Sequence, residues 1–129
     1  MTSYTSEYSS EYFPPAPVVE IIIRPTAGGG TEVSLPAFVD SGADGTMLPI
    51  DALTTVGARY IETRRMRGVT GHTLTVDMYL VTVQVGAYVL PGIEAIAVTG
   101  EAEAILGRDV LNQFVISLNG LAQVVEFTQ

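Results

Sequence analysis

The sequence predicts an all-β protein, a closed barrel of short strands with one short helix near the C-terminus. Short runs rich in β-branched residues recur along the chain from residue 18 onward. Turns that contain glycine, at residues 28–30 and 119–120, separate neighbouring runs as the turns of hairpins do. Helical patterns are scarce, and the best candidates are residues 50–56, closed by Gly57, and the stretch after Gly107 through Phe114. Many strands with little helix are typical of this fold class.

Each strand is expected from its own pattern. The first two runs flank a glycine triplet and should pair as a hairpin. The third alternates between apolar and polar side chains through most of its length, which indicates a half-buried strand. The last two flank an Asn-Gly turn. The expected strands are residues 18–24, 31–35, 73–85, 93–98, 115–118 and 123–127. The basic run at residues 64–67 is interpreted as a solvated loop or strand edge.

Size and charge exclude several classes of function. A chain of 129 residues with 47% hydrophobic residues can bury the core of a single small domain. Its net charge of −8 gives no broad basic surface for nucleic acid or for an anionic membrane. No apolar run approaches the roughly 20 residues of a membrane-spanning helix, and no secretory signal is seen. A cytoplasmic location is therefore the default expectation. With no cysteine, disulfides and thiol catalysis are excluded.

The first seventeen residues differ from the rest in composition. Ser, Thr, Tyr and Glu lead into a proline-rich end, and no strand or helix period is visible. We predict a disordered or extended N-terminal leader at residues 1–17, followed by the folded domain at residues 18–129. The leader is interpreted first as a tail, and alternatively as a docking arm or a substrate of the protein's own site. The leader and residues 123–127 are also candidates for a sheet between subunits.

Two motifs carry the chemistry. An apolar run delivers Asp40 into a turn, Asp40-Ser41-Gly42, which Ala43, Asp44 and Thr46 follow. A second apolar run, at residues 105–106, ends in Gly107-Arg108-Asp109. Between the motifs lies a glycine-bearing turn at residues 67–72. An Asp-Ser-Gly tripeptide alone is a weak signal, because these are common turn residues. The order and spacing of all three features make the signal specific.

Taken together, these motifs resemble the retropepsin family, the retroviral-type aspartic proteases that build one active site from two identical chains. The resemblance covers about residues 18–127 and implies the retropepsin-like barrel and peptide-bond hydrolysis. Since the chain holds one Asp-Ser-Gly motif, it implies a homodimer with Asp40 from each subunit as the catalytic pair. The implied partner is a polypeptide substrate, and no metal or organic cofactor is expected.

The same resemblance implies roles for other residues. Ser41 would brace the active-site turn across the subunits, and Gly42 would line the floor of the site. Residues 65–73 would form a flap that closes over an extended peptide. Arg108 would form an ion pair with Asp44 that locks the helix to the active-site loop. The residues expected to bind substrate are Phe38, Gly42, Asp44, Gly68, Val69 and Ile105.

The chemistry of such a pair follows from elementary electrostatics. Two carboxylates in contact cannot both ionise cheaply, so they share one proton over a wide pH range. The ionised member can take a proton from a water molecule held between them. The protonated member can polarise the scissile carbonyl group. A bell-shaped pH–rate profile with an acidic optimum is expected.

Two other interpretations of the function remain open at this point. The same fold and dimer could be a non-catalytic peptide-binding or assembly module. A monomeric barrel in which Asp40 only caps a turn is a third possibility. The single histidine, His72, is interpreted as an exposed loop residue, because no serine lies in a nucleophile elbow and the ligand spacing of a zinc site is missing.

Overall fold

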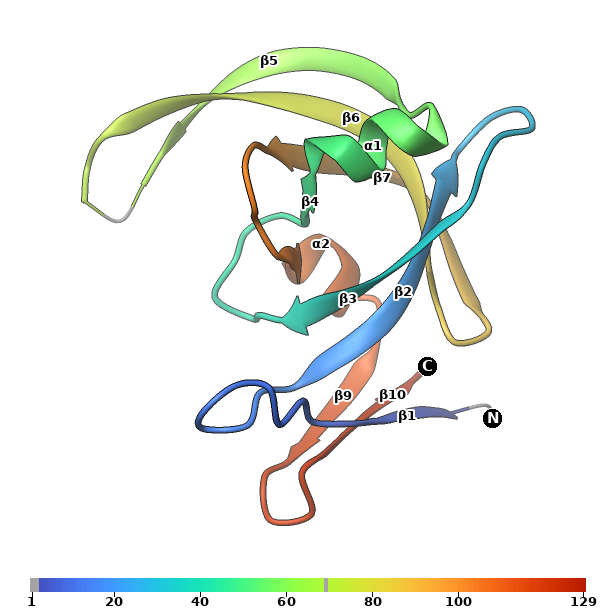
Figure 1. Ribbon diagram of the computed structural model, residues 1–129, viewed down its shortest axis with the longest axis vertical. Helices are drawn as coiled ribbons and strands as arrows, with labels where there is room; N and C mark the ends of the chain where they lie inside the picture. The colour runs from blue at the N-terminus through green and yellow to red at the C-terminus, as the bar shows by residue number, and fades with distance from the viewer. Residues whose placement is uncertain (1–2, 69) are drawn as a thin grey trace.

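The computed structural model describes residues 3–68 and 70–129 and arranges them as a strand-rich barrel beside a small sheet (Figure 1). The elements in chain order are β1 (Ser3–Glu7), β2 (Val18–Pro25), β3 (Val33–Val39), β4 (Met47–Pro49), α1 (Ile50–Val56), β5 (Arg59–Arg67), β6 (Thr73–Val85), β7 (Tyr88–Val98), β8 (Ala104–Leu106), α2 (Arg108–Leu111), β9 (Val115–Asn119) and β10 (Val124–Thr128).

Seven strands form one sheet, in the order β2-β3-β8-β4-β7-β6-β5, and an additional pairing between β2 and β6 closes it. The closed ring therefore consists of β2, β3, β8, β4, β7 and β6. Strand β5 lies outside the ring and pairs only with β6 in this sheet order. The β5–β6 hairpin is long, and its tip projects away from the barrel (Figure 1). Closure pairs β2 with β6, so the edge strand that remains in this sheet is β5.

The order of the smaller sheet is β1-β10-β9, and all its pairs are antiparallel. Part of the predicted leader at residues 1–17 is ordered in this sheet. Ser3–Glu7 form β1, which pairs with β10, and Ser9 forms an isolated β-bridge with Ala16. Because β1 and β9 occupy both edges of β10, a sheet between subunits could use β1 or β9 but not β10. The boundary between a leader at residues 1–17 and a domain at residues 18–129 stays a prediction.

Two parallel strand pairs bring distant motifs together. Strand β3 runs parallel to β8, with Phe38 opposite Ile105 and Val39 opposite Leu106. Strand β4 runs parallel to β7. The carboxyl ends of parallel strands meet at the same edge, so the residues that follow β3 and β8 emerge side by side. These residues are the two sequence motifs.

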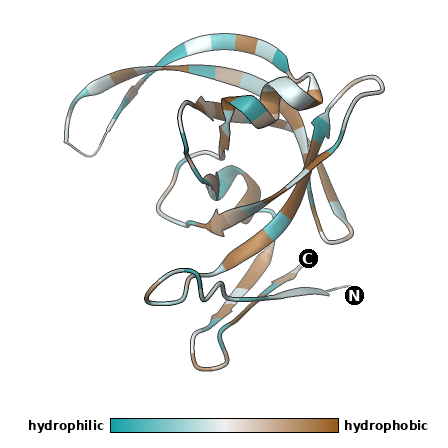
Figure 2. Cartoon of the chain, viewed as in Figure 1, coloured by the Kyte–Doolittle hydropathy of each residue, from teal (hydrophilic) through white to brown (hydrophobic). Residues whose placement is uncertain are grey.

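One hydrophobic core joins side chains of the barrel strands, of both helices and of β10 in the small sheet. Its largest fully buried side chains include Phe127, Ile21, Ile23, Leu48, Leu53 and Leu106. In Figure 2 strand β2 is mostly hydrophobic, whereas the β5–β6 hairpin alternates between hydrophobic and hydrophilic segments. Neither helix in the described part of the chain has the length and apolar character needed to cross a membrane.

The fold class predicted from the sequence is confirmed, and so are its hairpins. Residues 18–24 lie within β2, of which residues 18–23 pair with β3, and residues 73–85 are β6. The final hairpin turns through residues 120–123, so its loop is longer than the Asn-Gly pair alone. Residues 93–98 are only the second half of β7. The basic run at residues 64–67 belongs to β5, and β1, β4 and β8 were not predicted.

Candidate functional site

Asp40 directly follows β3, and hydrogen bonds from neighbouring strands fix its backbone. Its amide donates to the Leu106 carbonyl at 3.1 Å, which continues the parallel ladder by one residue. The preceding residue, Val39, donates to the Pro17 carbonyl at 3.0 Å. The side chain of Asp40 is half-buried, while Ser41 and Gly42 are exposed. The carboxylate is therefore presented at the surface from a rigid strand end.

The turn after Asp40 is closed on its own carboxylate. The Gly42 amide donates to Asp40 Oδ1 at 2.9 Å, and the Ala43 amide donates to the Asp40 carbonyl at 3.2 Å. A Cβ atom on Gly42 would lie 3.2 Å from the same Oδ1, tighter than most such contacts. Glycine at this position therefore leaves the carboxylate accessible while its amide orients it.

Helix α2 holds the active-site loop, defined as residues 40–46, from the other motif. The Arg108 amide donates to the Ala43 carbonyl at 3.0 Å, and its guanidinium donates to the Ser41 carbonyl at 2.9 Å. The same guanidinium forms an ion pair with Asp44. Both side chains are well exposed, at 43% and 78%, so the ion pair itself stabilises the fold little. The bonds to backbone carbonyls do more to set the geometry of the loop.

A buried network below this ion pair involves two residues to which the sequence assigned no role in holding the site. The Thr46 side chain is fully buried, and its hydroxyl donates to Asp109 Oδ1 at 2.7 Å. The same hydroxyl accepts from the Gly107 amide at 3.2 Å. Asp109 also accepts from the amides of Thr46, at 3.2 Å, and Val110, at 2.9 Å. The sequence signal for the role of Asp109 was its place in the first turn of a helix. Acidic residues are common there because they interact favourably with the helix dipole.

Replacing Thr46 with valine is expected to lower the free energy of unfolding by about 2 kcal/mol, because shape is kept while the Gly107 amide and the Asp109 carboxylate each lose a partner. Urea denaturation measures the change. Thr55→Val is the matched control, since its hydroxyl donates to the Asp51 carbonyl at an exposed site. Its effect should stay within about 0.5 kcal/mol. Equal effects of the two substitutions would contradict a special role for Thr46.

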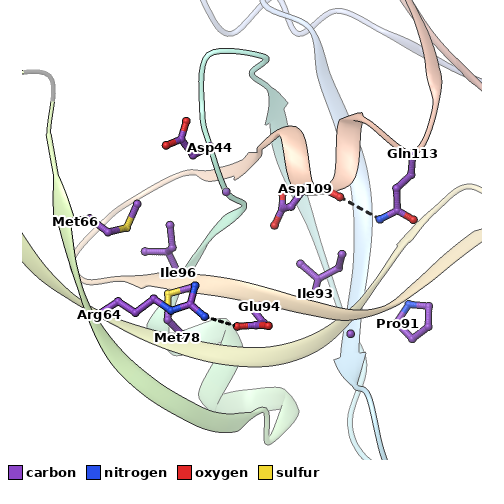
Figure 3. A pocket seen from close by; sticks show the side chains of 12 residues that line it. Asp44, Arg64, Met66, Met78, Pro91, Ile93, Glu94, Ile96, Asp109 and Gln113 are labelled. Carbon is purple, nitrogen blue, oxygen red and sulfur yellow. Dashed lines mark hydrogen bonds and ion pairs between the residues drawn. The ribbon is translucent and has the colours of Figure 1, made fainter.

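A cavity of about 480 Å³ opens beside the active-site loop. Figure 3 shows Arg64 and Met66 of β5 on one side, Glu94 of β7 below, and Asp44 and Asp109 opposite. Met78, Ile93 and Ile96 add apolar surface. This mixture of apolar walls with a few polar groups is typical of a ligand site.

Each charged side chain that lines this cavity has a hydrogen-bond or ion-pair partner. Arg64 donates to Glu94 at 2.8 Å and also forms an ion pair with Glu62. These carboxylates, Glu62 first, raise the pKa of the Arg64 guanidinium, so it stays charged. Asp44 is paired with Arg108, and Asp109 is held by the Thr46 network. The lining holds the three carboxylates of Asp44, Glu94 and Asp109 and the one guanidinium of Arg64, so the cavity carries a net negative charge.

The structure separates the other predicted site residues into two groups. Phe38 lines a second cavity, of about 270 Å³, which does not overlap the lining of the first. Ile105 lies opposite Phe38 in the sheet register. Gly68 lies at the tip of the β5–β6 hairpin, where its amide donates to the His72 carbonyl at 2.9 Å. Val69 lies outside the described residues. In this single chain, Asp40 lines neither of these two cavities.

The described residues offer little support for a histidine-dependent site or a metal site. His72 is exposed at the hairpin tip. Across residues 3–68 and 70–129, no group of three His, Asp or Glu side chains gathers in a way that could hold a metal ion.

Comparison with known proteins places this geometry in a family. The family model described as aspartyl protease matches residues 25–110, more than half of the chain. No curated protein matches by sequence. The structure of a retropepsin-like aspartic protease from Rickettsia conorii is similar with a TM-score of 0.69, at 12% identity over 98% of this chain and 90% of that one.

Two viral enzymes have similar folds. The EIAV protease, solved with the inhibitor HBY-793, has a TM-score of 0.60 at 20% identity, over 84% of this chain and 93% of that one. The simian foamy virus (mac) protease has a TM-score of 0.53 at 24% identity, over 74% of this chain and 91% of that one. At these identities the likeness shows the fold, and the family model shows the relationship. The chain therefore belongs to the aspartyl protease family, and its fold is similar to that of retropepsin-like members.

Proposed function

We propose that the chain is an aspartic endopeptidase that acts as a homodimer, with Asp40 of each subunit forming the catalytic pair. The observation that carries the proposal is the position of Asp40. Its half-buried carboxylate stands at the end of a fixed strand, oriented by the Gly42 amide at 2.9 Å. The chain has a single Asp-Ser-Gly motif, so the second carboxylate must come from another copy. A two-fold axis near Asp40 would supply it.

The exposed sides of the small sheet support a dimer. Strand β9 is an edge of the β1-β10-β9 sheet, and its Val115 and Leu118 are 68% and 55% exposed. An edge strand with exposed apolar side chains is prone to pair with another chain. Contact between copies at this edge would cover both the unpaired backbone groups and the apolar side chains.

In the proposed mechanism the two Asp40 carboxylates share one proton and hold a water molecule between them. The ionised carboxylate takes a proton from this water as its oxygen attacks the scissile carbonyl carbon. The protonated carboxyl donates a hydrogen bond to the carbonyl oxygen. Collapse of the tetrahedral intermediate breaks the C–N bond, and the carboxyl group that took the proton from water gives it to the leaving amine, which returns the pair to its singly protonated state. The hydrogen bond from Gly42 keeps each carboxylate aimed at the centre of the pair.

The substrate would be an extended polypeptide lying between the active-site loops and the β5–β6 hairpins. A strand in that position can bond to backbone groups on both sides while alternate side chains enter pockets. We assign Gly42, Asp44, Gly68 and Val69 to contacts with the substrate backbone, and Phe38 and Ile105 to side-chain pockets. The hairpin tips would act as flaps that exclude water. A cytoplasmic location stays a prediction from the sequence.

Mapping cleavage sites by mass spectrometry tests the proposal. Wild-type protein is incubated with unfolded polypeptides from pH 4 to pH 8, with the Asp40→Asn variant as the blank. Internal cuts that need Asp40 are expected, with rates highest at acidic pH and falling on both sides, because one proton must remain on the pair. No cuts from a sample shown to be dimeric would instead favour a peptide-binding or assembly module. Activity that rises steadily through pH 8 would indicate a different nucleophile.

A further inference from the structure

The N-terminal segment is fastened beside the active-site loop at both of its ends. The Tyr8 amide donates to the Gln123 carbonyl at 2.8 Å, and the backbones of Ser9 and Ala16 bond to each other at 2.8 and 3.1 Å. The Pro17 carbonyl accepts from Val39, the residue before Asp40. Residues 10–15, here called the N-terminal loop, therefore project from an anchored base next to the strand that delivers the catalytic carboxylate.

Tyr12 is the residue of this loop that turns toward the barrel. Its ring meets Phe38 edge to face, with centroids 4.7 Å apart. Its hydroxyl donates to Glu103 Oε1 at 2.6 Å. This hydrogen bond, more than the charge of Glu103 itself, raises the pKa of the Tyr12 hydroxyl, which therefore remains a donor at neutral pH. The next residue, Phe13, is fully exposed. The loop thus holds one specific ring against the barrel.

These contacts make Tyr12 a wall of the 270 Å³ cavity. Phe38, Pro36 and Pro49 give it apolar surface, and Glu103 and Ala104 are also part of its lining. A water molecule takes about 30 Å³ of liquid, so the space is large enough for an amino-acid side chain. The Tyr12 ring forms one wall of this space, so it restricts the size of the side chain that can enter.

The cavity lies next to the proposed chemistry. Strand geometry puts residues 38 and 40 on the same face, roughly 7 Å apart along the chain. Phe38 pairs in register with Ile105, and the Asp40 amide bonds to the next carbonyl along, that of Leu106. A peptide whose scissile bond lies at Asp40 would therefore have a neighbouring side chain within reach of the cavity.

We propose that Tyr12 is a specificity-determining residue, and that its ring forms part of the substrate site. This inference rests on the proposed function. The cavity receives an apolar side chain of the substrate close to the scissile bond, and the Tyr12 ring, held by Glu103, sets the largest side chain that fits. The occupant is apolar because the walls are apolar and the one carboxylate at the cavity, Glu103, already accepts from Tyr12.

The test compares kcat/KM for peptides that differ only in side-chain size at each position around the cut. Tyr12→Ala is expected to favour aromatic over smaller aliphatic side chains at one position by about tenfold relative to wild type, because the limiting wall is gone. Tyr12→Phe keeps the ring and should retain most of the wild-type preference. Phe13→Ala is the matched control, and its fully exposed side chain predicts an unchanged profile.

Each outcome decides between the two proposals. An active, dimeric Tyr12→Ala protein with the wild-type profile would overturn the role of Tyr12 and leave the endopeptidase proposal intact. Cleavage that Asp40→Asn also performs, or no cleavage by wild type, would overturn the proposed function and this inference with it. Melting temperature and dimer mass are measured for every variant. If Tyr12→Ala does not fold, Tyr12→Leu replaces it, with a smaller shift in the same direction expected.

Discussion

An asparagine in place of Asp40 is expected to lower kcat by about a thousandfold or more, while the chain still folds and dimerises. Asparagine keeps the shape of aspartate and can still accept the hydrogen bond that Gly42 donates at 2.9 Å. It cannot take a proton from water, and it cannot share a proton with a second carboxylate. Turnover is measured on a peptide chosen from the cleavage map, with circular dichroism and molecular mass as checks of structure. Asp51→Asn, on the exposed face of α1, is the control for the loss of one charge.

Mixing the two proteins tests whether both carboxylates are needed in one dimer. If each active site takes one Asp40 from each chain, a tenfold excess of Asp40→Asn chains should lower activity per wild-type chain about tenfold after subunit exchange. The reason is that nearly all wild-type chains would then sit in mixed dimers with a single aspartate. Activity per wild-type chain that does not change with the excess would contradict a shared site.

Alanine at Gly107 is expected to destabilise the protein by about 3 kcal/mol and to remove most of its activity. A Cβ atom at this position would lie 2.4 Å from the Gly45 carbonyl carbon and 2.5 Å from its oxygen. These are backbone atoms of the active-site loop, so no side chain can move aside to make room. Either the loop or the start of α2 must shift, and Arg108 and Asp109, which hold the loop, would shift with it.

Urea denaturation and the peptide assay measure the two effects of Gly107→Ala. Gly120→Ala is the matched control, because nothing lies within 4 Å of a Cβ atom there. This control should leave activity unchanged and stability equal or slightly higher, since alanine restricts the unfolded chain. If Gly107→Ala proved as stable and active as Gly120→Ala, the close approach of Gly107 to the loop would not be needed for stability or activity.

Patterns that repeat over a few residues predicted much of the fold correctly. The β-branched run predicted β2, the alternating run predicted β6, and the Asn-Gly turn predicted the β9–β10 hairpin. Gly57 ends α1 in the left-handed conformation with φ of 76°. Short strands escaped prediction. Strands β4 and β8 have three residues each, too few to show a period. Strand β5 carries mostly polar, exposed side chains because it lies outside the ring.

The sequence by itself determined the family, the order of the motifs and the identity of the proposed catalytic aspartate. It did so because the Asp-Ser-Gly turn and the Gly-Arg helix start are local patterns with specific chemistry. The tertiary structure alone decided how β3 and β8 pair, how Thr46 meets Asp109 across 63 residues, and how Tyr12 meets Glu103 across 91. Such contacts depend on how the whole barrel packs, because a threonine, a tyrosine or a carboxylate can bond to many partners. The packing of the whole chain selects the partners that these side chains have.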